Sequence, residues 1–206
     1  MTANRVVLAT HNAKKLEELR RLVADAGIDV VGLSEVADYP EPAETELTFE
    51  GNALLKATAA AQATGLPALA DDSGLEVDVL NRMPGVRSAR WAGPEGDDRA
   101  NLELLLRQLH DVETRRRTAR FVCVMAFAHP DGRTELQRGE VEGVIITEPR
   151  GSNGFGYDPI FVPQGFEQTT AELTAEAKDE ISHRGRAVRA MVARLPELLA
   201  ADSGEE

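Results

Sequence analysis

Asp71 and Asp72 are adjacent carboxylates that could bind a metal ion or take a proton. An apolar run that ends at Ala70 precedes them, and Ser73 and Gly74 follow. This order predicts a buried strand that ends at a cleft, and ligands of open α/β sheets bind at the carboxyl ends of strands. Adjacent residues of an extended backbone point to opposite sides, so the two aspartates should have different roles. An ordinary Asp-rich turn is the alternative, because Asp, Ser and Gly are common turn residues.

A polar stretch at 10–15 follows a predicted strand that begins at Arg5 and precedes a predicted helix that begins near Leu16. The free N–H groups and the dipole of a helix N-terminus favour a bound anion. Lys14 and Lys15 add positive charge at the same place. The stretch is not a P-loop, because the GxxxxGK[ST] pattern is missing. It is either a phosphate site or a strand–helix connection with solvated lysines.

A helix predicted over 48–64 places Lys56 on the same face as Asn52, four residues earlier. Lys56 is a surface lysine unless that face lines the site. The acidic loop at 35–46 precedes this helix, and its carboxylates are surface groups on the simplest interpretation. One of them could instead complete a metal site with Asp72.

The glycine-rich run at 151–159 contains two aromatic residues, Phe155 and Tyr157. Glycine beside an exposed aromatic ring suits a flat ligand, because π faces stack on any base. The alternative is that the two rings fill the core. Further along, His183 and Arg184 could donate hydrogen bonds to a base edge or a phosphate. A lone histidine can equally have a structural role.

The remaining pattern alternates strands with helices. Further strands are predicted at 29–33, 75–80, 119–128, 134–146 and 160–162, with a hairpin between the 119–128 and 134–146 strands. Further helices are predicted around 102–109, from 174 onward and around 188–195. The helix over 48–64 can be capped by Thr48 and Gly65, and the helix around 102–109 by Asp97 or Asp98.

The chain of 206 residues is long enough for one large domain or two intimate lobes. Its net charge of −12 argues against non-specific binding to nucleic acid or anionic membranes, but a nucleotide could bind through local cations and a divalent metal. The basic triplet at 115–117 is expected to be a solvated linker. No signal-peptide or membrane-spanning pattern occurs. The single cysteine, Cys123, is expected to be buried and allows no internal disulfide, which suits the cytoplasm.

Five stretches together resemble the inosine triphosphate pyrophosphatase family, which removes non-standard purine nucleoside triphosphates. They lie at 9–15, 47–53, 70–75, 154–159 and 181–185, and they occur in the family's order. At one position the chain differs, since His11 stands where many relatives carry glycine. The resemblance implies an α/β fold with two lobes, a long twisted mixed β-sheet flanked by helices, an active site in the cleft between lobes, and a homodimer. We expect one such domain over 1–200 and a disordered tail over 201–206.

The resemblance also implies Mg²⁺-dependent hydrolysis of ITP, dITP and XTP to the monophosphate and pyrophosphate, which cleanses the nucleotide pool. Asp72 is then the catalytic proton acceptor and a metal ligand, and we choose Glu44 as the second metal carboxylate. The expected substrate-binding residues are Thr10, His11, Asn12, Ala13, Lys14, Lys15, Lys56, Ser73, Phe155, Gly156, Tyr157, Asp158, Lys178, His183 and Arg184. We expect no nucleic-acid or membrane partner and a cytoplasmic location.

Elementary chemistry leads to the same kind of reaction. Water can approach the phosphorus of a polyanion only after its charge is neutralised, which Mg²⁺ and lysines would do. We expect Asp72 to deprotonate the water that attacks the α-phosphorus, so that pyrophosphate leaves. Donors such as His183 and Arg184 would favour the 6-oxygen of hypoxanthine and xanthine over the amino group of adenine. Two alternatives stay open: a nucleotide phosphatase that releases orthophosphate, and a nucleotide-binding module without turnover.

Overall fold

The chain folds as an α/β protein, in a computed structural model that describes residues 4–10, 16–17, 19–20, 23, 27–36 and 42–200. The strands are β1 (Asn4–Leu8), β2 (Ile28–Gly32), β3 (Ala68–Val77), β4 (Met83–Pro84), β5 (Thr118–Ala128), β6 (Thr134–Ile145) and β7 (Phe161–Pro163). The helices are α2 (Leu33–Val36), α3 (Phe49–Thr64), α4 (Asp98–Gln108), α5 (Ala175–Ile181) and α6 (His183–Ala200). The strand order β2-β1-β3-β5-β6-β7, with β4 on β3, forms one mixed sheet. The predicted α/β class with a mixed sheet and flanking helices is confirmed.

The chain divides into two compact units. The first unit comprises Met1–Asp72, Val124–Arg138 and Ala187–Glu206, and the second comprises Ser73–Cys123 and Gly139–Arg186. The boundary between Asp72 and Ser73 lies within β3, and the other boundaries lie within β5, β6 and α6.

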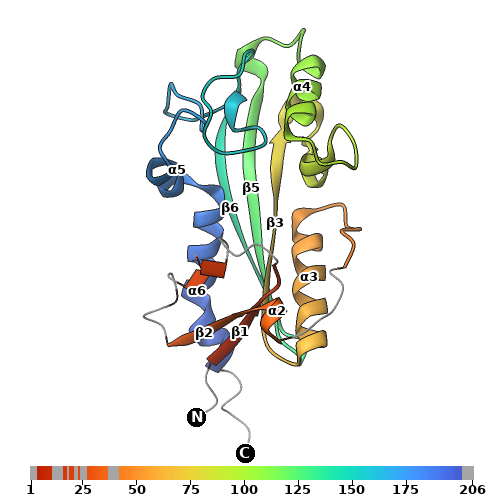
Figure 1. Cartoon of the computed structure of the whole chain (residues 1–206), viewed down its shortest axis with the longest axis vertical. Helices are drawn as coiled ribbons and strands as arrows, with labels where there is room; N and C mark the ends of the chain where they lie inside the picture. Colours follow the sequence, from red (N-terminus) through yellow and green to blue (C-terminus); the bar gives the residue numbers. More distant parts are fainter. Residues whose placement is uncertain are drawn as a thin grey trace, which may run out of the picture. The chain divides into compact units, whose positions relative to one another are not determined.

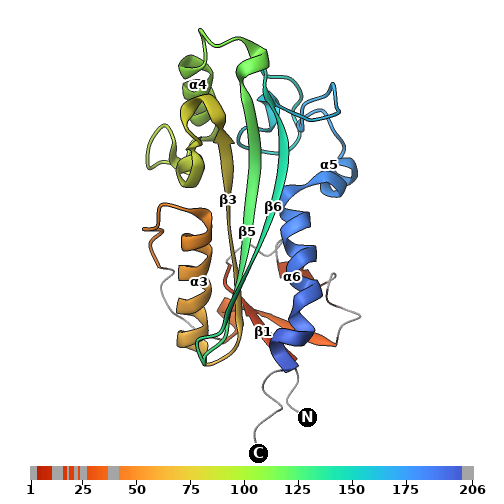
Figure 2. The same cartoon turned by 180° about the vertical axis from the view of Figure 1, so that it is seen from behind.

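In the first unit, parallel strands are combined with an alanine-rich helix. β1 pairs in parallel with β2 along its whole length and with β3 at Val7 and Leu8. Figures 1 and 2 both show α3 next to β3 and α6 on the side of β6. Thr48 caps α3 by accepting a hydrogen bond from the Gly51 N–H at 3.0 Å, and Gly65 ends the helix with a left-handed backbone. Both predicted caps are confirmed.

In the second unit, one apolar cluster joins strands, α4 and the glycine-rich run. Leu75, Leu105 and Phe161 are completely buried in this cluster, and Tyr157 is 5% exposed. β7 pairs with β6 in antiparallel fashion, and β4 pairs with the end of β3 in the same way. In Figures 1 and 2, α4 lies on the β3 side of the sheet and α5 on the β6 side.

β3 differs from the sequence prediction. The strand does not end at Asp71 and Asp72 but continues through Ser73 and Gly74 to Val77. β3 has hydrogen-bonded neighbours on both sides in the sheet, and this pairing outweighs the weak local turn preference of Ser and Gly. The aspartates therefore lie within a strand, and both are buried.

The outcome of the remaining predictions is mixed. The strand predicted over 75–80 ends at Val77 because Asp78–Leu80 forms a 3₁₀ helix, and Leu33, predicted to end a strand, begins α2. The hairpin between β5 and β6 forms, and a hydrogen bond of 2.9 Å from the His129 N–H to the Arg133 carbonyl closes its turn. Cys123 is buried, as predicted. The basic triplet is not fully solvated, because Arg117 is 4% exposed and its Nε donates to the Val112 carbonyl at 2.8 Å. The predicted tail at 201–206 lies outside the described residues.

Candidate active site

In the first unit, two buried polar residues of α3 contact Asp72, the second of the two adjacent aspartates of β3. The Asn52 Nδ2 donates to the Asp72 Oδ2 at 3.1 Å, and the Lys56 Nζ lies 3.4 Å from the Asp72 Oδ1. The spacing of four residues along a helix puts both side chains on the face that meets β3. Lys56 is therefore not an ordinary surface lysine, because it is 6% exposed and lies beside Asp72.

Glu44 completes this carboxylate–lysine cluster. Its Oε1 lies 3.0 Å from the Lys56 Nζ, and its side chain is 27% exposed. The loop that carries Glu44 is held by Asn52, whose Oδ1 accepts a hydrogen bond from the Glu46 N–H at 3.0 Å. Asn52 therefore links the acidic loop to the strand aspartate. Asn52 is not among the site residues predicted from the sequence, although its spacing from Lys56 predicts the shared helix face.

Burial controls the protonation of the cluster. It raises the pKa of the Asp72 carboxyl to about 6, and the negative charge of Glu44 adds to this effect against the opposing Lys56 and Asn52. Burial alone would lower the pKa of Lys56, but Asp72 and Glu44 outweigh it and raise that pKa. The lysine thus stays protonated, and the aspartate can accept a proton near neutral pH.

The cluster also has the donor set that magnesium requires. Mg²⁺ binds oxygen atoms and takes one or two carboxylates together with water and substrate phosphates. Asp72 and Glu44 both lie beside the same lysine nitrogen, so both carboxylates are partly neutralised. They are the two described carboxylates that could bind a divalent cation here, in the number that Mg²⁺ usually takes from a protein.

In the second unit, Asp158 organises the glycine-rich run. Its carboxylate is buried and accepts three hydrogen bonds: from the Phe155 N–H at 2.9 Å, the Lys178 Nζ at 2.5 Å and the Thr170 hydroxyl at 2.7 Å. A side chain on Gly154 would lie 2.1 Å from the same carboxylate, and the backbone there has a φ of +77°. Only glycine meets both conditions at this position.

The two aromatic residues of this run have different environments. Phe155 is 78% exposed, and the Lys178 Nζ lies 5.2 Å from its ring centroid. Tyr157 is buried in the core, and its hydroxyl donates to the Ser88 carbonyl at 2.9 Å. Each of the two open interpretations therefore applies to one ring: the Phe155 ring is available for stacking, and the Tyr157 ring fills the core.

His183 and Arg184 are the first residues of α6. The His183 ring stacks on Phe121 with a centroid distance of 5.2 Å and an interplanar angle of 16°. Phe121 in turn contacts Phe161 at 4.6 Å. These packing contacts fix the orientation of the imidazole at the start of the helix.

Of the other predicted site residues, two are described by the structure and five are not. Thr10 follows β1, and Ser73 is an exposed residue of β3 at the start of the second unit. His11, Asn12, Ala13, Lys14 and Lys15 lie outside the described residues. The predicted phosphate loop, including the role of Thr10, therefore remains a prediction.

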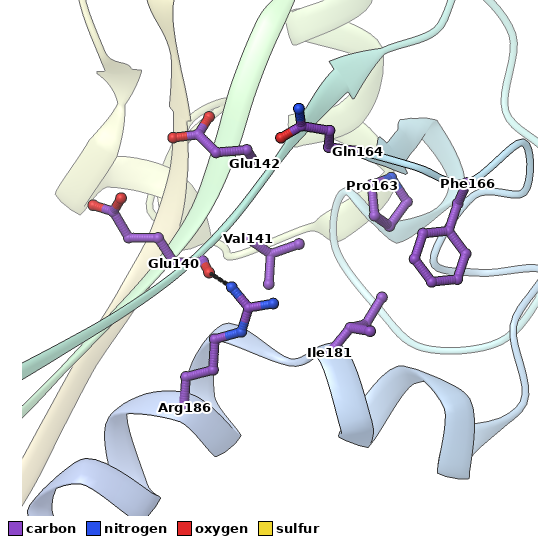
Figure 3. Close-up of a pocket in the computed structure, with 8 residues that line it drawn as sticks. All are labelled: Glu140, Val141, Glu142, Pro163, Gln164, Phe166, Ile181 and Arg186. Carbon is purple, nitrogen blue, oxygen red and sulfur yellow. Dashed lines mark hydrogen bonds between the residues drawn. The ribbon is translucent and has the colours of Figure 1, made fainter.

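The second unit also contains a cavity of about 300 Å³. Figure 3 shows Val141, Ile181 and Phe166 among its lining residues, while the carboxylates of Glu140 and Glu142 point away from Ile181 and Phe166. Its arginine, Arg186, donates to the Glu140 carbonyl at 2.7 Å. None of the predicted site residues that the structure describes lines this cavity.

Comparisons with known proteins agree with the fold. A sequence model of the Ham1 family matches residues 6–194. A dITP/XTP pyrophosphatase of Cutibacterium acnes is 62% identical over 193 residues, covering 92% of this chain and 95% of the relative. The structure of the Staphylococcus aureus Ham1 protein matches with a TM-score of 0.87 and 42% identity, covering 94% and 99% of the two chains. A crystal structure named nucleoside-triphosphatase / dITP/XTP pyrophosphatase from Mycobacterium abscessus matches with a TM-score of 0.82 and 52% identity, covering 91% and 98%.

Proposed function

The chain belongs to the Ham1 family, and on this basis we propose that it hydrolyses ITP, dITP and XTP to the nucleoside monophosphate and pyrophosphate. The observation that carries the proposal is the cluster of Asp72, Lys56 and Glu44, held by Asn52. It combines a carboxylate able to accept a proton near neutral pH with a buried cation and a second carboxylate. Hydrolysis of a phosphoanhydride requires activation of water and neutralisation of the phosphate charge, and these groups can contribute to both.

In this proposal Asp72 activates the attacking water. The carboxylate takes one proton from water, the water oxygen attacks the α-phosphorus, and the bond from that phosphorus to the bridging oxygen breaks. Pyrophosphate leaves as one piece. The raised pKa of Asp72 suits this step, because a general base works best when its pKa lies near the working pH.

Positive charge must balance the triphosphate. Lys56 lies beside the proposed base, and Lys14, Lys15 and Lys178 are proposed to contact phosphate oxygens. When bound by Asp72 and Glu44, Mg²⁺ would supply further charge neutralisation at the phosphate oxygens. Thr10, His11, Asn12, Ala13 and Ser73 are proposed to contact the substrate as well.

The base is proposed to stack on the exposed ring of Phe155, where Lys178 provides a cation. The neighbouring Gly156, Tyr157 and Asp158 hold this ring in place through the backbone and the core. His183 and Arg184 would donate hydrogen bonds to the 6-oxygen of hypoxanthine or xanthine. Adenine presents a donor at that position, and two buried donors that face each other disfavour binding strongly.

The decisive experiment is a panel of nucleoside triphosphates (ITP, dITP, XTP, ATP and GTP) with product analysis. We expect pyrophosphate from the first three and little turnover of ATP. Release of orthophosphate would favour a nucleotide phosphatase instead. Tight binding of ITP without any product would favour a non-catalytic nucleotide-binding module, and equal turnover of ATP and ITP would contradict base selection by His183 and Arg184.

We also propose that the enzyme requires Mg²⁺ and acts as a cytoplasmic homodimer. The metal requirement is supported by the donor set of Glu44 and Asp72. Removal of divalent cations with EDTA should abolish turnover, and added Mg²⁺ should restore it. Light scattering on the purified protein gives its mass in solution, and a value for one chain would contradict the dimer. No helix that the structure describes combines the length and apolar character needed to cross a membrane.

A further inference from the structure

Asp98 is the first residue of α4, but it is not the residue that caps the helix. The cap is Asp97, whose side chain accepts a hydrogen bond from the Ala100 N–H at 3.0 Å. The Asp98 carboxylate points elsewhere and accepts a hydrogen bond from the Gly156 N–H at 2.9 Å. This bond connects α4 to the glycine-rich run across 58 positions of the chain. The two adjacent aspartates thus have separate structural partners.

The Gly156 N–H is one of two backbone groups that hold the main chain on either side of Phe155. The Phe155 N–H itself is bound by Asp158 at 2.9 Å. The amides on both sides of the Phe155 α-carbon are therefore each held by a different carboxylate. The ring is 78% exposed, so core packing does not determine its direction. The two backbone hydrogen bonds fix the direction of the Phe155 Cα–Cβ bond, and the Lys178 Nζ lies 5.2 Å from the ring centroid.

We propose that Asp98 is a positioning residue for base binding, acting through the Gly156 N–H on the ring of Phe155. The inference rests on the proposed function, in which Phe155 stacks on the purine. Asp98 itself does not touch the substrate. A turn that is already ordered loses less conformational entropy when the base binds, so anchoring it improves affinity for the base.

Three variants separate this role from simple support of α4. Asp98→Ala removes the acceptor for the Gly156 N–H. Asp98→Asn keeps an acceptor oxygen at the same place but removes the charge. Asp97→Ala is the matched control, since it removes the neighbouring carboxylate and the helix cap but leaves the bond to Gly156.

The first readout is hydrogen exchange of the Gly156 amide, followed by NMR on the free protein. We expect faster exchange in Asp98→Ala, with exchange close to that of the unmodified protein in Asp98→Asn and Asp97→Ala. This measurement does not depend on any enzymatic activity. Unchanged exchange in Asp98→Ala would show that the bond does not hold the turn, and the inference would be rejected.

The second readout is steady-state hydrolysis of ITP. Loss of one exposed hydrogen bond should raise KM about five-fold in Asp98→Ala with little change in kcat, because the turn binds the base and not the reacting phosphorus. Asp98→Asn should restore most of the affinity. Competitive inhibition by inorganic tripolyphosphate, which has no ring to stack, should stay the same in all variants.

Two results would overturn the inference at this second stage. One is an equal rise of KM in Asp97→Ala and Asp98→Ala, which would mean that the stability of α4 is responsible. The other is weaker inhibition by tripolyphosphate in Asp98→Ala in step with the KM change, which would mean that phosphate binding was damaged. If the unmodified protein leaves ITP intact, the proposed function fails and base positioning with it, and the amide exchange data still establish whether Asp98 anchors the turn.

Discussion

At the scale of single residues, the chemistry depends on a carboxylate whose charge is not fully compensated. Asp72 is buried beside Lys56, yet burial and the nearby Glu44 raise its pKa to about 6. Because the pKa of this carboxyl is higher in the folded than in the unfolded chain, the unfolded chain releases the proton first. The free energy of unfolding therefore falls as the pH rises from the ordinary pKa of 3.8 through about 6. The fold therefore bears an energetic cost at neutral pH for keeping a proton acceptor there.

Replacing this residue should separate activity from stability. Asp72→Asn removes the proposed base, so turnover of ITP should fall by about 10² or more, the scale of general-base catalysis. The same change removes the buried charge, so the urea midpoint at pH 7.5 should not fall below that of the unmodified protein. Near-normal turnover would show that Asp72 is not the base. If the variant lost its cooperative unfolding transition in urea, misfolding would explain the lower turnover.

At the scale of single elements, the turn that carries Phe155 depends on two glycines for different reasons. Gly154 and Gly156 both have a positive φ, but a side chain on Gly154 would also collide with the Asp158 carboxylate. Around Gly156 there is open space. Gly154→Ala should therefore disrupt the turn, while Gly156→Ala should cost about 1 kcal/mol of backbone strain.

The comparison of these two variants tests the account of the turn. Denaturation in urea should show the larger loss for Gly154→Ala, and KM for ITP should rise more in that variant than in Gly156→Ala. Equal losses in the two variants would mean that backbone strain alone matters and that the Asp158 carboxylate does not fill the space beside Gly154.

The turn between β5 and β6 gives a pH-dependent prediction. The Arg133 N–H donates to the Asp131 carboxylate at 2.9 Å, and together with the Arg133 and His129 side chains it lowers the pKa of Asp131 to about 2. A lowered pKa stabilises the fold above the ordinary value of 3.8, and this contribution is lost as the pH falls toward 2. Asp131→Asn should lower the urea midpoint at pH 6, and the difference should shrink at pH 3.

Asp111→Asn is the control for this turn, because the Asp111 side chain is 75% exposed and lies 3.9 Å from the His110 ring nitrogen. Its midpoint should match that of the unmodified protein at both pH values. A difference for Asp131→Asn that keeps its size from pH 6 to pH 3 would mean that the carboxylate charge does not stabilise the turn.

At the scale of the whole molecule, three strands connect the two units without interruption. The boundaries after Asp72, Cys123 and Arg138 all lie inside strands, so unfolding one unit breaks the pairing of strands that belong to both. We expect one cooperative transition in urea. The fluorescence of Trp91, the single tryptophan, reports on the second unit, and far-UV ellipticity reports strongly on α3 and α6. The two curves should coincide, and separate midpoints would show that the units unfold independently.

The sequence by itself determined the features that depend on neighbours along the chain. The caps of α3, the hairpin between β5 and β6, the burial of Cys123 and the shared face of Asn52 and Lys56 follow from residue type and short spacing. These features depend on local backbone geometry and periodicity, which a single sequence displays directly.

Only the tertiary structure decided the features that depend on partners far apart in the chain. Sheet pairing keeps β3 extended through Gly74. The Tyr157 ring packs in the core, whereas the Phe155 ring is exposed, and the Asp98 carboxylate accepts a hydrogen bond from the Gly156 N–H. In each case the local conformational preferences of the residues differ by about 1 kcal/mol or less. A contact with a residue far along the chain is enough to select one of them, so the sequence alone does not decide the outcome.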